Sequence, residues 1–408
     1  MSASHSVSPH KRGVLPQPDP ASLRLPESPE KPNRALRSTK SHAQLSTQAS
    51  ARRAAMGTKP SKEQLTSTST TNLVMPSRAR AISDAPVPVE RQRTNRKPTN
   101  HSIASSHARK SSLELTFRDG PPPGTTAADS ITLLRSSILS SGVTATKEGM
   151  SDYRIYLWLA LLNIGPFPTE EYLALIHRGQ SPAYNKIQQD VFRTLATDAL
   201  FQRRVTNASL TRVLNATAWR VHDEQNTTSA SIKQTLYVQG VNVLSAPLLY
   251  ASRSEAQAYS LLTCLLTQHV PTYISPTMSG VHAGLDLIDR ILAHREPTLA
   301  AYLLDTHRLP AKIYAFPSVL TLCACTPPLP EVLKLWDFLF AFGVHLNVIC
   351  VVAQLLLMRQ KLYDSASPGK LLRSFPMLDA AKIIEQTLII ARELPEDVYA
   401  EVVAHGRA

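Results

Sequence analysis

Apolar side chains recur at intervals of three to four residues along the chain after position 130. Ile131, Leu134 and Ile138 form the first such run, and residues 153–162 form a strongly apolar one. This spacing places apolar positions on one face of a helix. We therefore expect helices there and over residues 256–266, 285–293, 330–340, 344–358 and 380–392.

Glycine and proline separate these runs, and no stretch alternates apolar and polar residues as half-buried strands do. The expected fold is all-α, built from many short helices, and the lack of a fixed repeat argues against a helical solenoid. The most apolar region, residues 338–358, is interrupted by His345, Asn347 and Gln354. That pattern predicts a buried helix, so we expect no membrane insertion.

The first part of the chain has a different composition. The 408 residues carry a net charge of +13, and residues 1–120 account for +12 of it. Those 120 residues contain one aromatic side chain, Phe117, and are rich in serine and proline. Such a segment buries too little apolar surface to offset the entropy of ordering. We expect a disordered basic tail over 1–125, a folded domain over 126–395 and a short C-terminal tail over 396–408.

The tail offers two sites for modification. Ser8 and Ser28 each begin a Ser-Pro-x-Lys sequence, the pattern that proline-directed cell-cycle kinases prefer. A phosphate on either serine would subtract about 1.5 to 2 charges from the tail, so both are candidate phosphosites. A nucleic-acid-binding tail is the weaker alternative, because no aromatic residues are interleaved for base stacking. We therefore expect no nucleic-acid partner.

Searches for metal and nucleophile motifs give nothing specific. The four cysteines do not form a disulfide framework, and Cys323-Ala-Cys325 is too short for a zinc knuckle. No HExxH, GxSxG or phosphate-binding loop is present, so we expect no metal and no cofactor. The chain opens with polar residues and no apolar segment follows, which favours an intracellular, soluble protein.

Two short segments carry candidate chemistry. In the first, Ile187, Asp190 and Arg193 fall on one face of a possible helix. In the second, Tyr237-Val-Gln239-Gly240 lies between a polar loop, residues 222–234, and an apolar helix. Taken alone, the first fits an ordinary surface ion pair and the second an ordinary helix start.

The order of the segments favours a more specific interpretation. Arg154, Trp158 and Leu161-Leu162 come first, then Ile187, Asp190 and Arg193, then Tyr237 and Gln239. This succession resembles the R-x3-W-x2-LL, IxxDxxR and YxQ motifs of the TBC domain, a family of GTPase-activating proteins (GAPs) for Rab-like GTPases. The resemblance covers about residues 128–395 and implies a two-lobed helical fold.

Later segments resemble one branch of that family, the fungal mitotic-exit and septation-checkpoint GAP subunit. They include residues 239–250, 314–317, 326–329 and 335–347. Val241 replaces the usual methionine after Gln-Gly, and Asn163 replaces a glycine common after Leu-Leu. The branch implies a two-component GAP, with a second subunit, that acts in the cytoplasm at the spindle pole body.

The resemblance also assigns roles. Arg193 would be an arginine finger and Gln239 a second finger, both supplied to a Ras/Rab-like GTPase in its GTP form. Asp190 would orient the arginine, while Ile187, Arg154, Trp158 and Tyr237 would be supporting residues. The chain would activate a GTPase and have no reaction of its own. The alternative is a TBC-fold scaffold that binds partner and GTPase without accelerating hydrolysis.

Overall fold

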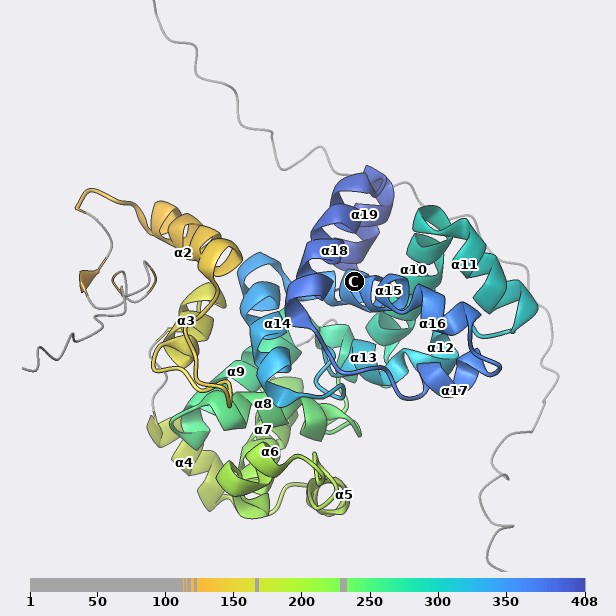
Figure 1. Ribbon diagram of the computed structural model, residues 1–408. Helices are drawn as coiled ribbons and strands as arrows, with labels where there is room; N and C mark the ends of the chain where they lie inside the picture. Colours follow the sequence, from red (N-terminus) through yellow and green to blue (C-terminus); the bar gives the residue numbers. More distant parts are fainter. Residues whose placement is uncertain are drawn as a thin grey trace, which may run out of the picture. The chain divides into compact units, whose positions relative to one another are not determined.

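The computed structural model describes residues 113, 115, 119–120, 123–165, 169–227 and 233–407. Across these ranges the regular secondary structure is helical and no strand forms, which confirms the all-α prediction (Figure 1). The candidate phosphosites Ser8 and Ser28, and most of the predicted tail, lie outside the described residues.

The first lobe is built around its longest helix, α7. This helix packs on α4, α5, α8 and α9, while α6 packs on α8. The helices of this part of the chain are α2 (Ala127–Ser141), α3 (Arg154–Leu161), α4 (Thr169–His177), α5 (Tyr184–Val191), α6 (Ala199–Arg204), α7 (Asn207–Thr227), α8 (Val241–Ala251) and α9 (Glu255–Cys264).

The second lobe is organised by two apolar helices, α10 and α15, which pack on each other. Its elements are η2 (Leu265–His269), η3 (Pro271–Ile274), α10 (Ser279–Arg295), α11 (Pro297–Ala301), η4 (Tyr302–Thr306), α12 (Ala311–Tyr314), α13 (Phe316–Leu320), α14 (Leu329–Phe342), η5 (Val344–Leu346), α15 (Asn347–Leu357), α16 (Arg359–Tyr363), α17 (Pro368–Leu372), α18 (Ala380–Glu393) and α19 (Glu396–Ala404). None of the described helices is long and apolar enough to cross a membrane.

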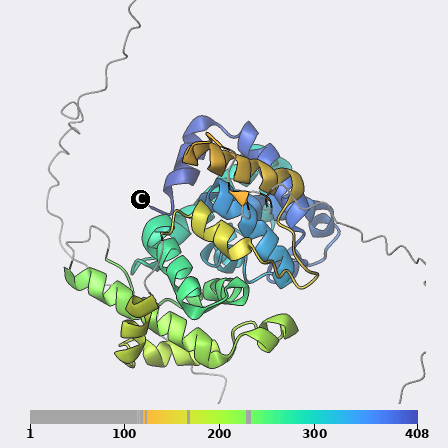
Figure 2. The same cartoon turned by 90° about the vertical axis from the view of Figure 1, so that its left-hand side faces the viewer.

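Helix α14 connects the two lobes. It packs on α3 and α8 of the first and on α18 of the second, and Figure 1 shows it between them. Helix α2, orange in Figure 2, begins with a capping box between Thr126 and Asp129 and lies against α14. The apolar core runs without a break from one lobe to the other.

Three predicted boundaries need correction. The polar loop predicted from His222 is wrong at its start, because α7 continues to Thr227. The short C-terminal tail is also wrong: α19 packs on α10, and Val402 is fully buried. The tail predicted to reach residue 125 is wrong at Leu113, which is buried in a small apolar cluster with α2, α3 and α14.

A buried ion pair joins α3 to α14. Arg154 Nε donates to Asp337 Oδ1 at 2.9 Å, and its Nη2 donates to Oδ2 at 2.9 Å. The indole Nε1 of Trp158 donates to the same Asp337 Oδ1 at 2.8 Å. Burial raises the pKa of Asp337, and Arg154 and Trp158 reduce that effect. Both charged groups are buried. Removing either one would leave the other unpaired in the interior, which would lower the stability of the fold.

Removal of one partner tests this pair. We expect Arg154→Met to lower the free energy of unfolding by about 3–5 kcal/mol, because the Asp337 carboxylate stays buried without its cation. Urea unfolding measures the change. Arg203→Met is the control: its ion pair with Glu148 is 64% and 53% exposed, so the cost should stay below about 1 kcal/mol. If Arg154→Met lowers the free energy of unfolding by no more than the control does, the buried pair does not contribute as described.

Candidate functional site

The first part of the site is the turn that follows α5. Ile187 is fully buried on this helix, and Asp190 is 5% exposed one turn later. The helix ends at Val191, and the Arg193 amide closes a turn onto the Asp190 carbonyl at 3.2 Å. The turn carries Arg193 outward, where its side chain is 49% exposed. Phe192 beside it is 67% exposed.

Asp190 accepts hydrogen bonds from its own turn and from one distant segment. Its Oδ1 accepts from Arg193 Nε at 3.0 Å and also from Nη2. Its Oδ2 accepts from the Tyr237 hydroxyl at 2.8 Å. Burial raises the pKa of Tyr237, and the bond to Asp190 raises it further, so the phenol keeps the proton it donates. One carboxylate therefore fixes both the arginine turn and the segment that leads to Gln239.

The second part of the site is the entry to α8. Gly240 has a φ of 112°, in the left-handed region, and a β-carbon there would lie 2.6 Å from Leu320 Cδ2 of α13. Glycine is required at this position for both reasons. The sharp turn presents Gln239 to solvent, and the Gln239 amide makes no hydrogen bond within the described part of the chain.

Asn242 links the two parts. Its Oδ1 accepts from the Gly240 amide at 2.9 Å, and its Nδ2 donates to Thr194 Oγ1 at 2.8 Å. Thr194 Oγ1 in turn donates to the Asp190 carbonyl at 2.9 Å. Asn242 and Thr194 are both buried, so each of these polar groups needs its partner.

Arg193 and Gln239 together line two adjoining hollows. One has a volume of about 310 Å³ and is also lined by Phe316, Pro317 and Leu320 of the second lobe. The other, of about 580 Å³, is lined by Lys186, Gln189, Asp190, Phe192, Arg193, Tyr237 and Gln239. The site thus offers a cation and a free carboxamide at one surface that both lobes contribute to.

The arrangement suits an anionic ligand that also needs a hydrogen-bonding partner. Asp190 holds the Arg193 fork through Nε and Nη2, which leaves Nη1 free to donate. A planar guanidinium can bridge two oxygens of a phosphate. The carboxamide of Gln239 can accept from one group and donate to another. Within the described residues, no set of three or more potential metal ligands gathers in one place.

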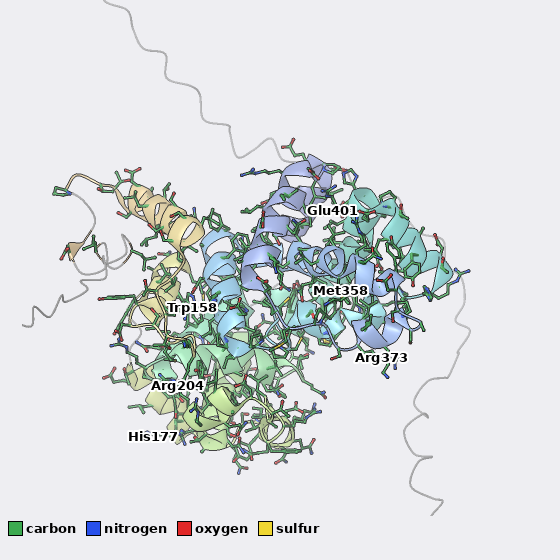
Figure 3. The ribbon with its side chains drawn as sticks, viewed as in Figure 1. Trp158, His177, Arg204, Met358, Arg373 and Glu401 are labelled. Carbon is green, nitrogen blue, oxygen red and sulfur yellow. The ribbon has the colours of Figure 1, made fainter. Side chains whose placement is uncertain are left out.

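The predicted site residues therefore separate into two sets. Arg193, Gln239, Asp190 and Tyr237 come together around the hollows, with Ile187 buried beneath them. Arg154 and Trp158 line neither hollow and belong to the α3–α14 junction, where Figure 3 labels Trp158.

The roles of four residues were not predicted. Asn242 and Thr194 stand next to predicted residues, but only the fold shows that they bond to each other. Phe192 is apolar and exposed beside Arg193. Asp337, the partner of Arg154, gave the one usable signal, because it is a lone carboxylate within an apolar run.

A change at Asn242 tests the link between the two parts. We expect Asn242→Leu to lower the free energy of unfolding by about 1–3 kcal/mol, since the Gly240 amide and the Thr194 hydroxyl lose their partners. Hydrogen exchange of the Gly240 amide should become faster. Asn207→Leu, at an exposed position, is the matched control. Unchanged exchange at Gly240 would contradict the link.

Comparison with known proteins identifies a family. Residues 151–363 match the Rab-GTPase-TBC domain family. Cell division control protein 16 of Schizosaccharomyces pombe is 43% identical over 276 residues, covering 68% of this chain and 88% of that protein. Mitotic check point protein BUB2 of Saccharomyces cerevisiae is 40% identical over 281 residues, covering 68% and 92%.

A solved structure supports the fold. The Ypt/Rab-GAP domain of Gyp1p superposes with a TM-score of 0.52 at 17% identity, covering 64% of this chain and 92% of that one. With the sequence matches, this confirms the resemblance drawn from the three motifs: the chain belongs to the Rab-GTPase-TBC domain family.

Proposed function

We propose that this chain is a GTPase-activating protein that supplies Arg193 and Gln239 in trans to a Ras/Rab-like small GTPase in its GTP form. The observation that carries the proposal is the shared position of these two side chains. Both are exposed, both line the same hollows, and a buried hydrogen-bond network holds their segments together.

The chemistry follows from the needs of GTP hydrolysis. Negative charge develops on the transferred phosphoryl group, and an arginine supplied in trans accelerates the reaction by about 10³ to 10⁵. The free Nη1 of Arg193 is placed to donate to those oxygens. Gln239 accepts a hydrogen bond from the attacking water and so orients it. No cofactor of this chain is needed, because nucleotide and magnesium are bound by the GTPase.

The wider role is proposed from the relatives. Two of them carry names that refer to cell division control and a mitotic check point. We propose that this chain acts in the same process, as one subunit of a two-component GAP that restrains mitotic exit and septation in the cytoplasm at the spindle pole body. A second GAP subunit would be its stable partner.

Single-turnover GTP hydrolysis tests the two fingers. With a panel of Ras/Rab-like GTPases and the second subunit present, we expect Arg193→Ala to reduce the stimulated rate about 10³-fold or more, and Gln239→Ala to reduce it strongly. Arg193→Lys should not restore the rate, because an ammonium cannot bridge two phosphate oxygens.

The control is Arg203→Ala, which removes an exposed arginine of α6 outside both hollows and should leave the stimulated rate unchanged. Binding of the GTPase is measured in parallel. If all variants stimulate hydrolysis equally, Arg193 and Gln239 are not the fingers and the proposal fails. If no protein, including the wild type, stimulates hydrolysis while binding persists, the chain is a TBC-fold scaffold and the proposal also fails.

A further inference from the structure

A third hollow lies where the last residues of the chain meet α2 and α14. Its volume is about 210 Å³, and it shares no residue with the hollows around Arg193 and Gln239. Its walls come from α2, the end of α3, η2, the end of α14 with η5, and α19 with the residues that follow it. Two of these elements, α2 and α19, lie outside the segment that matches the family.

The charge of this hollow has one sign. It is lined by Arg135, His269, His345, His405 and Arg407, and no aspartate or glutamate is among its described lining residues. Arg135 is exposed and makes no hydrogen bond or ion pair with a described residue. Arg407 is also exposed, and its Nη2 lies 3.5 Å from His269 Nδ1. Two guanidinium groups therefore line the same hollow, and no described lining residue carries a counter-charge.

His345 adds a polar atom without a partner. Its Nε2 is buried and makes no hydrogen bond. Burial is the main cause that lowers the pKa of His345, and together with the nearby His405, Arg407 and His269 it brings the pKa to about 4. By contrast, His405 is satisfied, because its Nε2 pairs with the Tyr273 hydroxyl at 2.8 Å and its Nδ1 with the Val402 carbonyl at 2.6 Å. A buried nitrogen that lacks a partner is costly unless a ligand supplies one.

We propose that this hollow binds a phosphate group carried on a serine or threonine side chain of a partner protein. A phosphate brings about −1.5 to −2 charges and three acceptor oxygens. Arg135 and Arg407 can each donate to one of them, and His345 lies in the wall of the same hollow. The volume is below the roughly 300–1,000 Å³ of typical small-molecule sites, which suits one side-chain phosphate better than a whole cofactor.

The surroundings favour a peptide over a membrane as the carrier. Glu401 of helix α19 is paired with Arg290, and the first turn of the helix carries Glu396 and Asp397. A flat anionic bilayer approaching this end of the domain would be repelled by these carboxylates. A peptide presents a single phosphate and can place apolar neighbours on the exposed side chain of Val403 at the rim.

Fluorescence anisotropy with two labelled peptides tests the proposal on the full chain. The probes are an alanine heptapeptide with a central phosphoserine and the same peptide with serine. At about 150 mM salt we expect the phosphorylated probe to bind at least about tenfold more tightly. Arg407→Gln and Arg135→Gln should each remove about tenfold of that affinity. Both side chains are exposed, so neither change should affect folding.

The control is Arg373→Gln, at an exposed position away from α19 (Figure 3), which should leave the affinity unchanged. It also accounts for binding to basic residues elsewhere in the chain. Equal affinity for both peptides, or no change in Arg407→Gln, overturns the proposal. If the same peptide with glutamate in place of phosphoserine binds as tightly as the phosphorylated one, the choice of phosphate is overturned. Binding of phosphoinositide vesicles that exceeds peptide binding and depends on Arg407 overturns the choice of a protein carrier.

A second readout follows from His345. A bound dianion favours its protonated form, so anion binding should take up a proton and strengthen as the pH falls from 7 to 5.5. Inorganic sulfate is the probe, because its charge is constant over this range. The sulfate-induced rise in Tm should grow with acidity in wild type and grow less in His345→Gln. The groups facing His345 are Arg135, His269, His405, Arg407 and the Tyr399 ring. An identical pH dependence in both proteins contradicts the role of His345.

Discussion

The candidate site depends on how the Asp190 carboxylate is shared. One oxygen holds the Arg193 fork and the other holds the Tyr237 hydroxyl, from a segment 47 residues further along the chain. Asp190 is buried, so neither bond is exchanged freely with water. The turn after α5 and the entry to α8 are therefore fixed to a common point. The position of Arg193 relative to Gln239 follows from that point, although the two side chains do not bond to each other.

The polar groups of the site are divided by depth. Asp190, Thr194, Tyr237 and Asn242 are buried, and they satisfy one another. Arg193 and Gln239 lie at the surface with donors and acceptors to spare. This division matches what an activating surface requires, since the buried layer provides rigidity and the outer layer keeps its bonding capacity for a ligand. Helix α13 also restricts the entry to α8, because Leu320 lies too close to Gly240 for any side chain at that position.

Helical periodicity predicted the elements whose buried face is apolar, as in α2, α3, α14 and α18. It predicted no helix over α7, and the last turns of that helix were assigned to a polar loop because they contain His222, Asp223 and Asn226. It missed α19, whose sequence begins with Glu396 and Asp397 after a proline. The motifs identified Arg193 and Gln239, whereas the contacts of Asp337 with Arg154 and of Thr194 with Asn242 were not predicted. Those pairs join positions 183 and 48 residues apart, and spacing along the chain carries no signal for them.

The two buried aspartates explain how an all-helical fold with a continuous apolar core keeps one register. Apolar contacts between helices are non-directional, so they do not select one direction of approach. Hydrogen bonds to a carboxylate require both a short distance and a direction. Asp337 joins α3 to α14 through such bonds, and Asp190 joins the turn after α5 to the segment that leads into α8. Asp337 accepts from Arg154 and Trp158, on successive turns of α3, and Asp190 accepts from Arg193 and Tyr237. A slide of one helix that kept one of these bonds would strain the other. We infer that these pairs, more than the apolar contacts, set the precision with which the surface at Arg193 and Gln239 is presented.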